Sequence, residues 1–393
     1  MANKSSKKEP VLVLGGDANT LSIVRCLSLR GVAVAVSTEC NSPALRSRFC
    51  GAKYPVPKGK DNKDYWADLL LSGERSELKG SVLFACCDDA VQFLCAHHDE
   101  LARSYLLYQF DPKLRLALLD KQHTYELAKS VGVAVPQTWT VNRIEDVERI
   151  LPELTFPVIV KPLLSHLFRR QFGGRKYLRA DNSDQLLRLQ KEVLDKGLKS
   201  MICDFIPGPD SLGHSYISFR NAEGQELFQA TTHMIRRYPK NQGTLCYYYT
   251  EWTPEVAEFG GKLLQGIGFT GFAHMEIKFD PRDGQYKLIE VNPRFPALIE
   301  TYRQSGIDVP YIIYCHLTGR SLPRIANFKN HVRMISVLDD FRAYLELNRL
   351  GELTLGQWLK SMSPHQNYVY FKLNNPWPAA YNVLWRFKRK MFG

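Results

Sequence analysis

The chain has 393 residues, of which 45% are hydrophobic, 23% charged and 11% aromatic, and these proportions exclude collagen-like, coiled-coil and wholly disordered proteins. No run of about 18 apolar residues is present, so we expect no membrane-spanning helix. The formal charge of +12 is concentrated in residues 1–10, 165–180 and 386–393, whereas a nucleic-acid-binding domain usually carries a basic stripe with interleaved aromatic residues. We therefore expect no nucleic-acid partner.

The first ten residues are polar and basic, and the nine cysteines show no CxxC spacing. This start lacks the pattern of a secretory signal, and the cysteines predict neither a disulfide framework nor a cysteine zinc site. We expect a cytoplasmic protein with a basic polar N-terminus over residues 1–10.

Residues 11–112 alternate short apolar runs with amphipathic segments. The apolar runs at 11–14, 32–36 and 82–85 predict strands, and the segment 20–30 predicts a helix. Strand–helix–strand order with continuously apolar strands predicts a parallel-sheet, Rossmann-like domain. Gly15 and Gly16 end the first strand, but no third glycine follows at the dinucleotide spacing, so nicotinamide or flavin binding is not expected.

A second α/β unit is predicted over residues 113–320. Helical patterns occupy 118–130, 183–199 and 254–268, strands occupy 156–162 and 201–206, and the segments from 211 to 250 alternate as an antiparallel sheet does. Lys161 lies at the end of its strand, and a basic loop over 163–176 follows it.

The most informative segment is the predicted hairpin at 271–292. If its turn is centred on Asp283, Glu276 faces Glu290 and His274 faces Asn292. Two-residue alternation then places Glu290, Asn292 and Arg294 on the face of Glu276, and turns the apolar side chains of Met275, Ile277, Ile289 and Val291 into a core. Two carboxylates and an amide oxygen suit Mg²⁺ beside phosphate oxygens. The alternative is an exposed hairpin whose acids face water.

Several segments of residues 10–320 form a recognisable series, in this order: 120–121, 132–136, 156–162, 204–210, Glu276 and 288–294. Together they resemble the ATP-grasp superfamily, within its carboxylate–amine ligase branch that includes D-aspartate-ligase-like proteins. The resemblance implies an ATP-grasp fold, in which two α+β lobes clamp ATP behind the N-terminal domain.

The resemblance also implies roles for individual residues. Lys121 and Lys161 would bind the phosphates, and the loop with Ser165, Arg169 and Arg170 would cover them. The ribose would contact Asp210, and the adenine would contact the interlobe strand Cys203, Asp204, Phe205 and Ile206. The chain departs from the family here, since glutamate or glutamine is common where Cys203 stands and glutamate is usual at Asp204. Metal ligands would be Glu276, Glu290 and Asn292, binding Mg²⁺ or alternatively Mn²⁺, and Arg236 or Arg237 would contact the substrate carboxylate.

We thus expect an ATP- and Mg-dependent ligase that activates a small carboxylate as an acyl phosphate and joins it to an amine, releasing ADP and phosphate. Arg294 would stabilise the oxyanion. The alternatives are an ATP-grasp kinase that phosphorylates a hydroxyl and a non-catalytic ATP-binding scaffold. The C-terminal extension, 321–393, ends in a basic amphipathic helix from about residue 380. Such a helix either lies on the inner membrane surface or packs on the protein itself.

Overall fold

The computed structural model describes residues 8–163, 168, 171–173, 175–325 and 327–392. Its N-terminal part is a parallel sheet in the order β2-β1-β3, formed by β1 (Val11–Leu14), β2 (Val34–Ser37) and β3 (Val82–Ala85). Every residue of these strands is buried, as expected for a parallel sheet covered on both faces. The helices of this part are α1 (Ala18–Ser28), α2 (Asn62–Leu71), α3 (Asp88–Ala96) and α4 (His98–Leu101).

The small lobe is a four-stranded antiparallel sheet in the order β4-β7-β5-β6. Its strands are β4 (Thr138–Val141), β5 (Val158–Pro162), β6 (Leu178–Ala180) and β7 (Ser200–Asp204), and its helices are α7 (Ile144–Ile150) and α9 (Ser183–Asp195).

The helix predicted at 118–130 begins three residues later, as α6 (Lys121–Ser130), and a separate helix, α5 (Pro112–Ala117), precedes it. The break follows from Asp120, whose Oδ1 accepts hydrogen bonds from the backbone N–H groups of Gln122 and His123 at 2.8 and 3.0 Å. An aspartate in this position caps a helix, so Lys121 becomes the first residue of α6.

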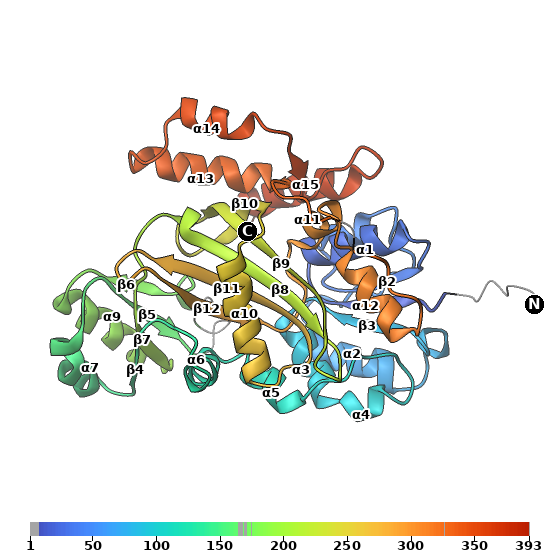
Figure 1. Ribbon diagram of the computed structural model, residues 1–393, viewed down its shortest axis with the longest axis horizontal. Helices are drawn as coiled ribbons and strands as arrows, with labels where there is room; N and C mark the ends of the chain where they lie inside the picture. The colour runs from blue at the N-terminus through green and yellow to red at the C-terminus, as the bar shows by residue number, and fades with distance from the viewer. Residues whose placement is uncertain (1–7, 164–167, 169–170, 174, 326, 393) are drawn as a thin grey trace, which may run out of the picture.

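The large sheet has seven strands in the order β12-β11-β8-β9-β10-β13-β14. They are β8 (Gly213–Arg220), β9 (Glu226–Tyr238), β10 (Thr244–Thr250), β11 (Gly271–Asp280), β12 (Gln285–Asn292), β13 (Arg333–Ile335) and β14 (Asn367–Tyr368). Helix α10 (Pro254–Gly266) lies across one face of this sheet (Figure 1).

Residues beyond 320 continue the large sheet through β13 and β14, so the predicted boundary at 320 runs between strands of one sheet. The other C-terminal elements are α13 (Val337–Arg349), α14 (Leu355–Met362) and α15 (Trp377–Phe392), and α11 (Ile299–Gln304) and α12 (Val309–Leu317) precede them. Among the described residues, no helix combines the length and apolar composition needed to cross a bilayer.

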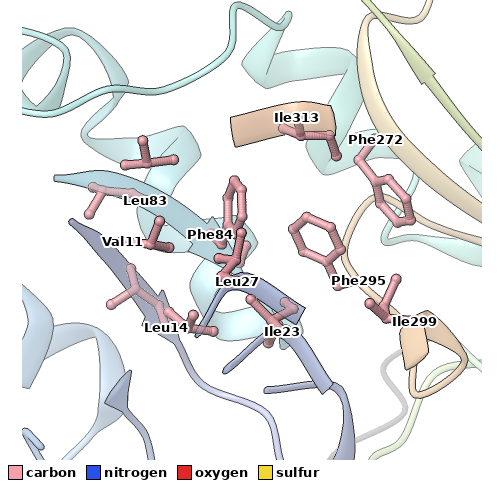
Figure 2. Packing of buried hydrophobic residues seen from close by; sticks show 14 of the residues in the cluster. Val11, Leu14, Ile23, Leu27, Leu83, Phe84, Phe272, Phe295, Ile299 and Ile313 are labelled. Atoms are coloured by element: carbon pink, nitrogen blue, oxygen red, sulfur yellow. The ribbon is translucent and has the colours of Figure 1, made fainter. Parts of the chain in front are cut away.

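One hydrophobic core joins the N-terminal sheet to the large sheet (Figure 2). The ring of Phe295 lies between the rings of Phe84 from β3 and Phe272 from β11, with centroid distances of 5.0 and 4.7 Å. Because Phe295 directly follows Arg294, this packing fixes Arg294 at the junction of the two sheets.

Candidate active site

The hairpin β11–β12 has the predicted register at its acidic end. His274 pairs with Asn292, and Glu276 pairs with Glu290. A bulge follows, so that Ile277 pairs with Leu288 instead of Ile289. Leu288 is therefore buried in the core while Ile289 is only half-buried, and the prediction that Ile289 points into the core was wrong.

The two facing carboxylates are surrounded by cationic and amide groups. Arg237 Nη2 lies 3.3 Å from Glu276 Oε2, Asn292 Nδ2 donates to Glu290 Oε1 at 3.0 Å, and Lys121 Nζ lies 3.9 Å from Glu290 Oε2. Burial by itself would raise the pKa of Glu290, but the charges of Lys121 and Lys176 and the Asn292 hydrogen bond hold that pKa well below its usual range. Glu290 is therefore ionised at neutral pH.

Lys161 reaches the same place from the small lobe. Its side chain is 7% exposed, and its Nζ donates to the Tyr125 hydroxyl at 2.7 Å and to the Ile289 carbonyl at 3.4 Å. Tyr125 in turn donates to the Ile289 carbonyl at 2.9 Å. The structure thus brings Lys121 and Lys161 close to Glu290 from two different elements.

Arg294 is held at the end of the hairpin by a residue of the N-terminal domain. Its Nε lies 2.5 Å from Oδ1 of Asp88, in the first turn of α3. Burial alone would lower the pKa of Arg294, but the Asp88 carboxylate raises it. The adjoining Pro293 carbonyl accepts a 2.9 Å hydrogen bond from Arg115 Nη2. Sequence reasoning missed Asp88 and Arg115, because both lie far from residue 294 in the chain.

Arg236 and Arg237 point to opposite faces of β9, since successive strand residues alternate. Arg236 is buried and forms a two-pronged ion pair with Asp340 of α13, at 2.7 and 3.0 Å. Arg237 contacts Glu276 and also Asp210, at 3.3 Å each. The structure therefore brings Arg237 to the acidic pair and separates Arg236 from it, while Asp210 is engaged by Arg237.

Of the predicted adenine-binding strand, Cys203 is the most deeply buried residue. It is 1% exposed and pairs with both Thr138 and Ile159, so its side chain lies in the core. Burial raises the pKa of Asp204, and the Phe205 ring lies 4.8 Å from the guanidinium of Arg179. The predicted flap residues Ser165, Arg169 and Arg170 lie outside the described residues.

Lys278 is a further member of this site that sequence reasoning missed. Its Nζ donates to the carbonyls of Ile206 and Gly208 at 3.0 and 3.2 Å, so it ties the hairpin to the end of the interlobe segment. Burial lowers the pKa of Lys278 to about 8. Its position two residues after Glu276 on the same strand face is the signal that could have identified it.

A polar cavity of about 720 Å³ lies at the carboxyl ends of the N-terminal strands. Gly15 and Gly16 after β1, Glu39 after β2 and Cys87 after β3 line one side, and residues of α13 and α15 line the other. Gly15 has φ +72°, and a Cβ there would lie 2.1 Å from Cys87 Sγ, so this turn requires glycine. Cys87 directly precedes Asp88, which places the cavity beside the Asp88–Arg294 ion pair.

Known proteins resemble the chain over most of its length, although no protein-family model matches it. A D-aspartate ligase of Enterococcus faecium (strain Aus0004) is 26% identical over 309 residues, covering 75% of this chain and 73% of that relative. N5-carboxyaminoimidazole synthetase from Staphylococcus aureus, solved in complex with ADP, has a TM-score of 0.64 at 18% identity, covering 92% of this chain and 88% of that one.

A second solved structure is the biotin carboxylase domain of a Hydrogenobacter thermophilus 2-oxoglutarate carboxylase, in complex with MgADP, ADP and bicarbonate. It has a TM-score of 0.64 at 15% identity and covers 83% of this chain and 73% of that one. Each of the three likenesses covers at least three quarters of the chain, so none is confined to a single domain.

Proposed function

This chain has the ATP-grasp fold and is a homologue of D-aspartate ligase, and from that premise we propose that it is an ATP-dependent carboxylate–amine ligase. The observation that supports this most strongly is the Glu276–Glu290 pair, with Asn292, Lys121 and Lys161 around it. Like charges facing each other across two strands are unfavourable unless cations compensate them, and here Arg237 and Lys121 lie beside the two carboxylates. The donor set of two carboxylates and one amide oxygen fits a hard divalent cation.

In this proposal Glu276, Glu290 and Asn292 would hold Mg²⁺, with Mn²⁺ as the alternative, and a bound ion would supply positive charge beside the phosphates. The Nδ2 of Asn292 already donates to Glu290, so its Oδ1 is the atom available to a cation. Lys121 and Lys161 bind phosphate oxygens as point charges. Arg237 contacts Glu276 directly. Lys278, two residues further along β11, donates a hydrogen bond to the Ile206 carbonyl and so holds the interlobe segment against the hairpin.

The chemistry follows from these positions. A substrate carboxylate oxygen attacks the γ-phosphorus of ATP, the bond to the β-phosphate oxygen breaks, and ADP leaves. The amine then attacks the carbonyl of the acyl phosphate and loses a proton, and inorganic phosphate departs as the amide forms. Arg294, held by Asp88, stabilises the negative oxygen of the tetrahedral intermediate.

We assign the amine substrate to the 720 Å³ cavity. Its lining includes Asp17, Glu39 and Asp89, which attract an ammonium group, and Arg342, which can bind a carboxylate. Arg386, also in the lining, is paired with Asp339 at 2.5 Å, and Arg342 lies 3.7 Å from the same carboxylate. Groups of both signs in one cavity favour a zwitterionic substrate such as an amino acid.

Nucleotide product analysis tests the proposed function. Mg-ATP is incubated with pooled amino acids, dipeptides and small carboxylates, and we expect substrate-stimulated release of ADP and phosphate. A stable phosphorylated product would indicate a kinase, and AMP with pyrophosphate would indicate adenylation; either result contradicts the proposal.

We also propose that this protein acts in the cytoplasm and contacts the inner membrane surface through α15. One side of the helix packs on the protein, where Asn382 is buried and Arg386 pairs with Asp339. Several of its apolar side chains face outward: Val383 is 48%, Leu384 69%, Phe387 63% and Met391 58% exposed. Four basic residues and no acid occupy positions 386–393. An outward apolar stripe beside basic residues suits an anionic lipid surface.

Liposome co-sedimentation tests the membrane contact. We expect binding to vesicles that contain anionic phospholipid, and little binding to purely zwitterionic vesicles, because both the charge and the apolar stripe contribute. The double variant Leu384→Glu/Phe387→Glu should lose this binding. Leu29→Glu, a matched change at an exposed leucine of the N-terminal domain, should not. Equal sedimentation of both variants with anionic vesicles would contradict the proposal.

A further inference from the structure

A cluster of two histidines and one glutamate lies on the large sheet, away from the candidate active site. His214 of β8 pairs with His233 of β9, and Glu251 directly follows β10. His214 also pairs with Ile277 of β11, whereas Glu276 pairs with the next residue, Ser215. The histidines therefore lie on the sheet face opposite the acidic pair, on the side that α10 covers.

The three side chains present potential ligand atoms to one another. One ring nitrogen of each histidine and a carboxylate oxygen of Glu251 all lie within 4.8 Å of one another. His233 Nδ1 is 3.1 Å from Glu251 Oε2, and the two imidazole rings meet edge to face with centroids 4.7 Å apart. Tyr249 stacks on His233, and Tyr286 meets His214 edge to face, so both rings are held in place.

One ring nitrogen of this cluster lacks a hydrogen bond. Nδ1 of His214 is buried and has no hydrogen-bond partner within the described part of the chain, whereas Nδ1 of His233 has the Glu251 carboxylate beside it. His214 as a whole is 6% exposed. A buried polar atom without a hydrogen bond costs about 1–3 kcal/mol, so the unpaired nitrogen of His214 requires a reason.

We propose that His214, His233 and Glu251 form a binding site for a transition-metal ion of the Zn²⁺ class. Two imidazoles and a carboxylate are a common ligand set for this ion, and a water molecule completes the tetrahedron. Metal–ligand bonds of about 2.1 Å place tetrahedral ligand atoms about 3.4 Å apart. The three ligand atoms here lie within 4.8 Å of one another, so side-chain rotations would bring them to that spacing.

Metal binding would give the buried His214 ring a partner and join β8, β9 and the residue after β10. Burial lowers the pKa of both rings, which agrees with neutral imidazoles that keep a lone pair for a metal. The side chains of His233 and Glu251 are 23% and 32% exposed, so an ion can reach the cluster from solvent. The site is distinct from the nucleotide site in position and in preferred metal.

Zinc titration of the full-length chain tests this proposal without any activity assay. The protein carries Cys40→Ser, which removes the exposed cysteine, and is stripped with EDTA and dialysed. Zn²⁺ is then titrated against a chromophoric chelator, without nucleotide and with excess Mg²⁺ to occupy the oxygen ligands of the hairpin. We expect one tight equivalent, and visible absorption bands of tetrahedral Co²⁺ when that ion is used instead.

Three variants show whether this equivalent belongs to the cluster. His233→Gln and Glu251→Gln should each weaken Zn²⁺ binding at least tenfold. His331→Gln is the matched control, because His331 stacks on Tyr249 but is not part of the ligand set. The proposal is overturned if the parent protein takes no Zn²⁺ from the chelator, or if the two ligand variants bind as tightly as the control.

Discussion

Replacing Glu290 by glutamine is expected to reduce ligase turnover by at least about 10³-fold, which corresponds to about 4 kcal/mol of lost transition-state stabilisation. Glu290 accepts a hydrogen bond from Asn292 and forms an ion pair with Lys121, and it faces Glu276 across the hairpin. A neutral amide keeps the shape of the side chain but removes the charge that holds the metal. The measurement is kcat/KM for ADP release with the substrates found in the pooled assay.

The same variant should change the pH dependence of stability in a defined direction. Glu290 has a lowered pKa in the folded protein, so its ionised form stabilises the fold above the ordinary value of 4.5. That contribution is lost from the wild type as the pH falls below about 4.5, and it is absent from Glu290→Gln throughout. The two unfolding curves should therefore converge in acid.

A matched control separates a site effect from a general effect of losing a carboxylate. Glu255→Gln changes an exposed residue in the first turn of α10, on the other face of the sheet. This variant should keep wild-type turnover. Near-normal activity in Glu290→Gln, or an equal loss in Glu255→Gln, would contradict the assignment of the metal ligands.

The neighbouring residues Arg236 and Arg237 should give opposite phenotypes when each is replaced by methionine. Arg236→Met breaks a buried ion pair and leaves Asp340 uncompensated, which should cost about 3–5 kcal/mol of unfolding free energy. Arg237→Met removes the cation beside Glu276 and should reduce turnover about 10²-fold with a smaller effect on stability. Urea denaturation and the ligase assay measure the two effects separately.

A double variant sharpens this comparison. Arg236→Met/Asp340→Leu removes both charges of the buried pair and should recover much of the lost stability, because an apolar pair can replace a buried ion pair. If Arg236→Met were as stable as wild type and lost as much turnover as Arg237→Met, then Arg236 would act in the site, against the structure.

Part of the hairpin could be predicted from the sequence alone. Its register from His274 to Glu276 follows from the position of one turn and from two-residue alternation, and the structure confirms it. The bulge that places Leu288 rather than Ile289 in the core did not follow from these rules. Two-residue alternation assumes that the pairing of the two strands is uninterrupted. Lys278 was on the correct face, but its contacts with Ile206 and Gly208 depend on how two lobes meet.

Long-range contacts account for most of what sequence reasoning missed. Nothing near Arg236 in the chain distinguishes it from Arg237, and only the packing of α13 on β9 supplies Asp340 as its partner. Asp88 likewise meets Arg294 only because a shared core joins the first sheet to the large one. The strands β13 and β14 could not be predicted, because strands of three and two residues are too short to show a two-residue alternation.

The formation of an acyl phosphate is tested most directly by following carboxylate oxygen into phosphate. The substrate carboxylate is labelled with ¹⁸O, and the phosphate released during ligation is analysed by mass spectrometry. An acyl phosphate leaves one carboxylate oxygen on the departing phosphate, so we predict one ¹⁸O atom in each phosphate released, in step with amide formation. Unlabelled phosphate, or label recovered in AMP, would contradict this mechanism.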